Sequence, residues 1–376
     1  MKHAAFLSDG RIGILENGQV RMLGCITAEK YKEREREIRQ RKDWKQSGTG
    51  AMFTGAYNFH NSAENVRLDI SGLSMGMDDR LAFALNYENG GGIHFKSLDE
   101  EGLETPIFVD LKTHFYDLAV HPNGNIAVSC SRSYTERHIG FLKVDAPHLQ
   151  FLTDGDCVDA NPSWSLKDEN VLYYDSFGVA YGSSGQIVAF GPRSINRLNI
   201  KTGELDEVFS DDKFDFLNPF EDASGNLYFI RRPYKPAKGK MSARDYAKAP
   251  GKIMRAFGGW LDWKTRTYTG ESLNTTGANP AKGNQKTPQQ IFVEGNLLEA
   301  EKTLKKNAAA GDKSPGIIPR SWELVVRATD GTQKVLQTSV MDYCVNPQGE
   351  IYSNGKYLIH GENAVKANIA AKLICL

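Results

Sequence analysis

Carboxylates at repeated positions are the side chains in this 376-residue chain whose spacing could support chemistry. Each opens a repeated unit, with His3 at the matching place in the first unit; they are Asp69, Asp117, Asp159, Asp215 and Asp342. If the first strand of each unit lines a common channel, the carboxylates form a ring, and such oxygens favour calcium or magnesium. The alternative is structural, because Asp often accepts hydrogen bonds from the backbone of its own turn.

Other sequence patterns that support catalysis are missing. The chain contains no His-Glu-x-x-His motif, no Cys-x-x-Cys pair and no P-loop. Gly182-Ser183-Ser184-Gly185 is not the Gly-x-Ser-x-Gly elbow of a nucleophilic serine, and Gly90-Gly91-Gly92 precedes a predicted strand rather than a helix. We therefore predict no catalytic residue and no cofactor, with calcium or magnesium at the aspartates as the alternative.

An internal repeat supplies the elements that would position these aspartates. Three segments of equal length align without gaps, and their glycines coincide: 2–12, 116–126 and 341–351. Three more, with a longer turn, run over residues 69–81, 159–171 and 215–227. Each predicts a strand, a turn rich in Pro, Asn, Asp and Gly, and a second antiparallel strand. Two further strands usually follow, and a four-stranded unit recurring at about 40–60 residues predicts an all-β fold, the β-propeller.

The number of blades depends on one long interval. Unit starts are visible at residues 3, 69, 117, 159, 215 and 342. The last interval, of 127 residues, has room for a degenerate blade starting near residues 285–295. We therefore predict seven blades in a single domain, residues 1–376. Six is the alternative, in which residues 1–24 complete the blade begun at Asp342 by pairing with the carboxyl-terminal strands.

One repeat is better preserved than the others. It reads Phe151-Leu152-Thr153-Asp154-Gly155-Asp156, followed by Asp159-Ala160-Asn161-Pro162-Ser163-Trp164-Ser165-Leu166-Lys167-Asp168. Its leucine-threonine end, proline, tryptophan-serine pair and acidic turn resemble the WD40-like repeat of the TolB-type propellers. With weaker copies, the resemblance covers most of the chain. It implies the fold but little about activity, because propellers host many functions.

Two predicted helices interrupt the repeat. Residues 28–45 hold helix formers at nearly every position, with eight basic and five acidic side chains. One interpretation is a solvated helix lying over one side of the propeller, and the other is contact with an acidic partner or nucleic acid. A second helix is predicted at about residues 298–310, within an irregular basic insertion at residues 231–320.

Charge is segregated along the chain, although its 46 basic and 46 acidic residues cancel. Residues 231–290 carry 13 basic and 3 acidic side chains, whereas residues 145–225 carry 5 basic and 15 acidic ones. Aromatic residues interleave the basic stretch, as in surfaces that bind single-stranded nucleic acid, but they would equally fill a blade. The candidate partner-binding residues are Arg34, Arg36, Arg39, Arg41, Arg231, Arg232, Lys235 and Lys238.

The cysteines and the apolar pattern bear on the compartment. Five scattered cysteines are typical of reduced thiols: Cys25, Cys130, Cys157, Cys344 and Cys375. Because no apolar run matches a secretory signal or a membrane span, we expect a cytoplasmic protein with no membrane contact. The expected function is a non-enzymatic scaffold that binds a protein or peptide. The alternatives are a calcium- or magnesium-dependent hydrolase or lactonase-like enzyme at the channel mouth, and a nucleic-acid-binding surface at residues 231–290.

Overall fold

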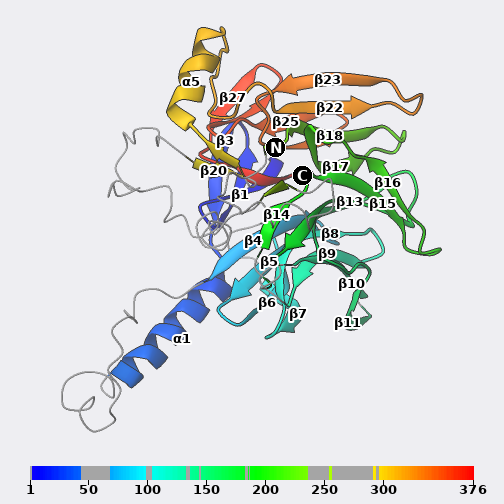
Figure 1. The fold of residues 1–376 in the computed structure, drawn as a ribbon. Coiled ribbons are helices and arrows are strands. Elements are labelled where there is room, and N and C mark those ends of the chain that lie inside the picture. The colour runs from blue at the N-terminus through cyan, green and yellow to red at the C-terminus, as the bar shows by residue number, and fades with distance from the viewer. Residues whose placement is uncertain are drawn as a thin grey trace.

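The chain folds into a β-propeller of six antiparallel blades (Figure 1). The computed structural model describes residues 2–43, 68–98, 104–132, 136–143, 145–182, 185, 187–235, 254–255, 291–293 and 296–376. Within these ranges, each blade is a sheet with four strands in meander order. Short turns of Asn, Asp and Gly connect the strands, as the repeat predicts; Gly124, for example, has a φ of 89°, which glycine adopts without strain.

The blades are numbered from the amino terminus. Blade 1 contains β28 (Ala371–Cys375), β1 (Lys2–Ser8), β2 (Arg11–Glu16) and β3 (Gln19–Leu23). Blade 2 contains β4 (Asp69–Met75), β5 (Leu81–Tyr87), β6 (Gly90–Lys96) and β7 (Glu104–Asp110). Blade 3 contains β8 (His114–Val120), β9 (Ile126–Ser131), β10 (His138–Lys143) and β11 (Ala146–Phe151).

The second half of the ring carries the extra elements. Blade 4 contains β12 (Cys157–Trp164), β13 (Val171–Tyr181), β15 (Ser194–Asn199) and β16 (Leu205–Phe209), and β13 also pairs with β14 (Ile187–Phe190), which pairs with β19 (Met254–Arg255). Blade 5 contains β17 (Phe214–Glu221), β18 (Leu227–Pro233), β22 (Glu323–Arg327) and β23 (Gln333–Thr338). Blade 6 contains β24 (Asp342–Asn346), β25 (Gly349–Ser353), β26 (Tyr357–His360) and β27 (Asn363–Lys366).

The ring is closed in blade 1, where the last strand of the chain pairs with the first. In the register of β28 and β1, Ala4 lies opposite Cys375 and Ala5 opposite Ile374. The expected closure through the blade begun at Asp342 is therefore wrong in its location, because blade 6 has four strands of its own. Closure gives β1 a partner on both sides and leaves β28 as the inner edge strand of blade 1.

The prediction of a seventh blade is wrong, and the six-blade alternative is confirmed. The long interval is an insertion between the second and third strands of blade 5, since β18 pairs directly with β22. Its described part contains a two-stranded sheet, β20 (Ile291–Val293) with β21 (Asn296–Leu298), and the helix α5 (Ala300–Ala309). The described residues Asn296 and Leu297 therefore belong to a short hairpin rather than to a blade.

Apolar side chains pack between neighbouring blades and hold the ring together. Leu81 and Phe83 of blade 2, for example, share a buried cluster with Ile12 and Ile14 of blade 1. Trp164 of blade 4 packs edge-on against Phe141 of blade 3 and donates its indole N–H to the Ala119 carbonyl at 3.0 Å. The tryptophan of the best-preserved repeat thus packs between blades 3 and 4.

The cysteine prediction is wrong for one pair. Cys344 on β24 and Cys375 on β28 form a disulfide with a Cα–Cα distance of 5.6 Å. They lie 31 residues apart in sequence, but ring closure makes β24 and β28 neighbours. Cys25, Cys130 and Cys157 are free. The disulfide removes the cysteine argument for a cytoplasmic location, because structural disulfides belong to oxidising compartments.

Both predicted helices are present. The helix α1 (Ile26–Asp43) follows blade 1 and projects away from the ring (Figure 1). α5 ends near Gly311, whose φ of 87° is the left-handed conformation common after a helix. Neither helix in the described ranges is long and apolar enough to cross a membrane.

Candidate functional site

The centre of the propeller is formed by the first strand of each blade. Neighbours around this ring, which we call the axial strands, are β28, β4, β8, β12, β17 and β24. β28, rather than β1, takes this place in blade 1, so His3 on β1 is not on an axial strand. Lys372 enters the centre instead, a residue that the repeat alignment does not reveal.

Two of the axial strands are bent at an asparagine. The register of β12 shifts at Asn161-Pro162, and that of β17 shifts at Asn218-Pro219. Asn161 has a φ of 49° and Asn218 a φ of 53°, in the left-handed region that asparagine tolerates better than most residues. Proline has no N–H to donate to the ladder. These bulges release the backbone N–H groups of both asparagines for contacts outside their own strand pairs, and that of Asn161 donates to Asp117 Oδ2 at 3.3 Å.

A buried carboxylate joins the two bulges. Asp175 on β13 is fully buried, and its Oδ2 accepts hydrogen bonds from Asn161 Nδ2 at 2.6 Å and from the Asn218 backbone N–H at 2.9 Å. Its Oδ1 pairs with Arg193 Nη1 at 2.8 Å. Every one of these partners lies in blade 4 or at the start of blade 5, so the contacts fix the two blades against each other.

Lys372 links the bulges to the rest of the ring. Its Nζ lies 2.5 Å from Asp117 Oδ1 and 2.8 Å from Asn161 Oδ1. Its backbone N–H donates to Asp342 Oδ2, while Asn218 Nδ2 donates to Asp342 Oδ1 at 2.6 Å. We call this set the axial network: Asp117, Asn161, Asp175, Asn218, Asp342 and Lys372.

The axial network leaves little free space. A pocket of about 20 Å³ lies between Asn161, Asn218, Asp342 and Lys372, with the indole of Trp322 on one side. That volume holds one water-sized molecule and is far below that of an ordinary ligand pocket. This pocket is therefore too small for an ordinary ligand.

Asp215 is paired with one cation and one backbone N–H of the chain. Its Oδ2 accepts a hydrogen bond from Arg232 Nε at 3.0 Å, and its Oδ1 accepts one from the Arg193 backbone N–H at 3.0 Å. The Arg232 guanidinium lies 4.5 Å above the Trp322 ring and is buried. Arg232 is thus inside the fold, and its interpretation as a partner-binding surface residue is corrected.

The two remaining aspartates lie in less charged surroundings. Asp159 accepts hydrogen bonds from Thr153 Oγ1 at 2.5 Å and Ser176 Oγ at 2.6 Å, yet burial keeps the pKa of its carboxyl above the usual value. Burial raises the pKa of Asp69 well above its usual range, and Asp69 Oδ1 has no hydrogen-bond partner within the described ranges.

The five aspartates are therefore dispersed among separate environments. Asp117 and Asp342 belong to the axial network, Asp215 pairs with Arg232, and the other two lie apart. In the described part of the chain, no three of them place carboxylate oxygens within 4.8 Å of one another. This arrangement favours the structural interpretation of the repeated aspartates over a shared calcium or magnesium site.

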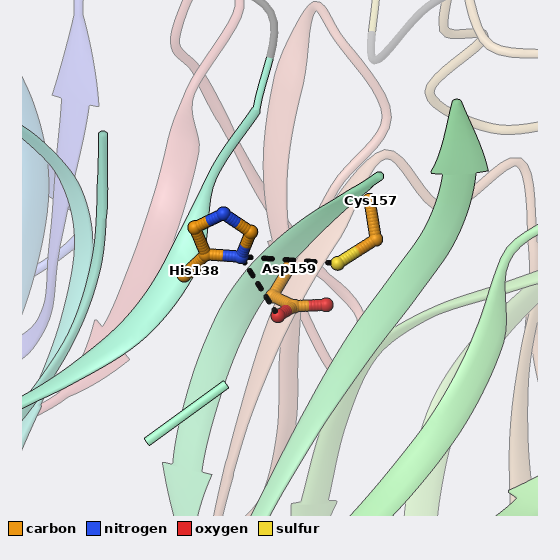
Figure 2. A group of neighbouring side chains, drawn as sticks. All are labelled: His138, Cys157 and Asp159. Atoms are coloured by element: carbon orange, nitrogen blue, oxygen red, sulfur yellow. Dashed lines mark hydrogen bonds and ion pairs between the residues drawn. The ribbon is translucent and has the colours of Figure 1, made fainter. Parts of the chain in front are cut away.

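One group of unlike ligand atoms does gather, between blades 3 and 4. Figure 2 shows His138 of β10 facing Cys157 and Asp159 of β12. His138 Nδ1 lies 3.9 Å from Cys157 Sγ and 4.0 Å from Asp159 Oδ2. Among the described residues it is the single cluster in which three potential metal-binding side chains place donor atoms within 4.8 Å of one another.

This cluster is not arranged as a proton relay. In a nucleophile–base–acid triad, one histidine nitrogen faces the nucleophile and the other faces the acid. Here the thiol and the carboxylate both face Nδ1 (Figure 2). Burial, reinforced by the charge of Asp159, raises the pKa of Cys157 to about 12, so the free thiol is protonated at neutral pH.

A second candidate site is the surface of α1, which is fixed at its first turn. The Glu104 carboxylate accepts hydrogen bonds from the backbone N–H groups of Ile26 at 2.9 Å and Thr27 at 2.8 Å. Lys96 Nζ lies 3.0 Å from the same carboxylate. Burial alone would raise the pKa of Glu104, but these hydrogen bonds and the lysine charge hold it at about 2. Glu104 therefore acts as a helix cap supplied by blade 2.

Beyond this anchor, α1 is largely exposed. Tyr31 packs against Tyr87 of blade 2 with ring centroids 4.6 Å apart. The described basic side chains that follow are exposed, among them the predicted Arg34, Arg36 and Arg41. Arg41 pairs with Glu37 at 3.7 Å, a solvated contact of small energetic effect.

The other predicted partner residues lie near blade 5. Arg231 pairs with Glu323 at 2.6 Å and is partly exposed, and Lys235 is exposed. Arg39 lies within α1, but its side chain is not among the described atoms. Lys238 lies outside the described residues. Most of residues 231–290, the predicted nucleic-acid surface, likewise lies outside the described residues.

Comparison with known proteins finds structural likeness at low identity and no sequence relative. No family model and no curated protein match the chain. TolB from Acinetobacter baumannii matches at 9% identity and a TM-score of 0.49, covering 100% of this chain and 66% of that one. The tricorn protease matches at 12% identity and a TM-score of 0.45, covering 99% and 34% respectively. A Lactobacillus plantarum protein matches at 10% identity and a TM-score of 0.43, covering 100% of both chains.

These values describe a likeness to TolB and tricorn-like β-propellers at low identity, and they give no activity. The chain spans less than two thirds of either the TolB or the tricorn protease chain.

Proposed function

We propose that this propeller binds a protein partner with an acidic surface, and that α1 is its docking element. The observation that carries the proposal is the helix itself, 18 residues long and held to the ring at its first turn. Most helices in proteins owe their stability to packing of one face, and an isolated helix of this length is marginal in water. A helix that projects from a rigid ring is well placed to pack against a second molecule.

Charge favours an acidic partner. Lys30, Lys32, Arg34 and Arg36 are exposed, and none of them forms an ion pair with another residue in the described ranges. Their charges are therefore available to a carboxylate-rich surface, which would approach faster and bind more selectively than a neutral one. The acids of α1 alternate with these residues and set the register of the contact.

The centre of the ring supports binding over hydrolysis. A calcium- or magnesium-dependent hydrolase needs carboxylates with free oxygen positions. Asp117, Asp215 and Asp342 instead accept hydrogen bonds or ion pairs from Lys372, Arg232 and backbone N–H groups. These contacts would compete with a metal ion at the channel mouth.

Affinity capture with charge-reversed variants tests the proposal. The full chain is compared with a triple variant of α1, Lys32→Glu, Arg34→Glu and Arg36→Glu. The matched control reverses three exposed lysines on other blades, Lys201→Glu, Lys334→Glu and Lys366→Glu. We expect a stoichiometric partner that the α1 variant loses and the control keeps, with binding that weakens as salt rises.

Two outcomes would overturn the proposal. One is recovery of no stoichiometric partner by the unmodified chain, and the other is equal recovery by all three proteins. Far-ultraviolet circular dichroism of each variant verifies that α1 and the blades remain folded.

A further inference from the structure

The inter-blade cluster of His138, Cys157 and Asp159 is built by the backbone of two blades. Arg137 and Val158 form an isolated parallel bridge, with hydrogen bonds from the Arg137 N–H to the Cys157 carbonyl at 3.2 Å and from the Asp159 N–H to the Arg137 carbonyl at 3.0 Å. Cys157 and Asp159 are two residues apart on β12, so their side chains point to the same side. The bridge places His138 next to both.

We propose that His138, Cys157 and Asp159 form a binding site for zinc or a similar borderline-soft divalent cation. The donor set of one imidazole nitrogen, one sulfur and one carboxylate oxygen is typical of zinc. All three donor atoms already lie within 4.8 Å of one another. The sulfur of Cys157 and the carboxylate oxygen of Asp159 both face His138 Nδ1, so the three donor atoms converge on one point, as ligands around an ion do (Figure 2).

The distances require only a small contraction. Zinc bonds of about 2.0–2.3 Å at tetrahedral angles bring two ligand atoms to about 3.5 Å from each other. Nδ1 lies 3.9 Å from Sγ and 4.0 Å from Oδ2. Both distances from Nδ1 therefore exceed the zinc-bound value by roughly half an ångström.

Neighbouring groups support the ligands. Thr153 Oγ1 and Ser176 Oγ each donate to one oxygen of Asp159, which orients the carboxylate as outer-shell partners of a metal ligand do. Thr153 Oγ1 is itself held by the Ile139 N–H at 2.9 Å. The carboxylates of Glu136 and Asp154 also lie close enough to act on Cys157, and their charges favour a cation there.

The burial of the cluster fits a three-ligand site with an open position. The Asp159 side chain is 3% exposed, whereas that of His138 is 16% exposed and Cys157 is half-buried. Solvent therefore reaches one side of the cluster. A fourth ligand from that side would complete a tetrahedral ion.

Metal loading of the full chain tests the site. The protein is stripped with chelator, loaded with zinc in thiol-free buffer, desalted and analysed for metal content. Cobalt serves as the spectroscopic probe, because a cobalt–thiolate bond gives a charge-transfer band in the near ultraviolet. The variants are Cys157→Ser and His138→Gln, and Cys25→Ser is the control, since Cys25 is a free buried thiol outside the cluster, between β3 and α1.

We expect one zinc ion per chain and a cobalt–thiolate band that Cys157→Ser abolishes and Cys25→Ser keeps. His138→Gln should weaken zinc binding by more than the roughly 10- to 100-fold that loss of an outer-shell group costs. Failure of the unmodified chain to retain zinc would overturn the proposal, as would retention that neither Cys157→Ser nor His138→Gln reduces. Melting curves of the metal-free variants separate loss of a ligand from loss of the fold.

Discussion

Replacement of Lys372 by methionine should destabilise the propeller, because it leaves a carboxylate of the axial network without its cation. The Lys372 and Asp117 side chains are 13% and 6% exposed, and their charged atoms lie 2.5 Å apart. Methionine keeps most of the side-chain length but donates no hydrogen bond. Asp117 then remains buried, and Asn161 Oδ1 also loses a donor.

The size of the effect follows from burial. Removing one partner of a buried ion pair costs about 3–5 kcal/mol, and the partial exposure of Lys372 favours the lower end. An unfolding entropy of about 2.1 cal/mol/K per residue gives a chain of 376 residues about 0.8 kcal/mol/K. A loss of about 3 kcal/mol therefore lowers the melting temperature by about 4 °C.

Thermal unfolding followed by circular dichroism measures this shift, with Lys366→Met as the control on an exposed position of β27. The double variant Lys372→Met, Asp117→Asn removes the orphaned charge and should recover part of the loss, giving a coupling energy of about 1–3 kcal/mol. Two results would contradict the coupling of the blades by the axial network. One is a melting temperature of Lys372→Met equal to that of the control, and the other is a loss of stability in the double variant equal to the sum of the losses in the two single variants.

Four further predictions concern other parts of the structure. Replacing Cys344 and Cys375 by alanine should lower the free energy of unfolding by about 3.5–4 kcal/mol, the chain-entropy value for a 31-residue loop, measured by denaturant titration; an unchanged midpoint would contradict it. Glu104→Gln should speed hydrogen exchange of the Thr27 amide about tenfold, with no change at an interior strand as the control. In the unmodified chain the same anchor is present above pH 4.5 and is lost as the pH falls toward 2, because the folded pKa of Glu104 is depressed. A protection factor of the Thr27 amide that stays constant between pH 4.5 and pH 2 would refute this prediction. Thr153→Val should weaken zinc binding by roughly 10- to 100-fold without abolishing the cobalt–thiolate band, and unaltered affinity would show that this hydroxyl does not support the site.

The repeat predicted the fold because turns and apolar strands are local features. Gly124 ends the turn of one unit, and the same turn chemistry recurs in the other units at intervals that the chain's strands follow. The seventh blade was wrong because an insertion between β18 and β22 has the length of a blade. Sequence spacing does not distinguish a blade from an insertion when the paired strands lie about 90 residues apart in sequence.

The centre of the ring was harder to predict, because its partners come from distant segments. Lys372 reaches Asp117 only after β28 has closed blade 1. The bulges do have a local signal: Asn-Pro occurs at both Asn161 and Asn218, and proline inside a strand is confined to edges or bulges. Aligning these pairs shows that Asp159 and Asp215 are not equivalent, since two residues separate the first from its proline and three separate the second.

The sequence indicates only two of the three members of the His138 cluster. Cys157 and Asp159 alternate on one predicted strand, so a shared side could be inferred. His138 lies 19 residues from Cys157, on an outer strand of the preceding blade, and the Arg137–Val158 bridge that brings it close does not belong to either sheet. A pairing between blades leaves no periodic pattern in sequence.

Photo-crosslinking from α1 tests the central claim most directly. A photoreactive amino acid replaces Lys32 or Arg36 on α1, or Lys366 on the outer strand of blade 6 as the control, and all three positions are exposed. Illumination in living cells should give one discrete adduct from the α1 positions and none from position 366. The absence of an adduct from α1, or the same adducts from all three positions, would contradict the assignment of α1 as the docking element.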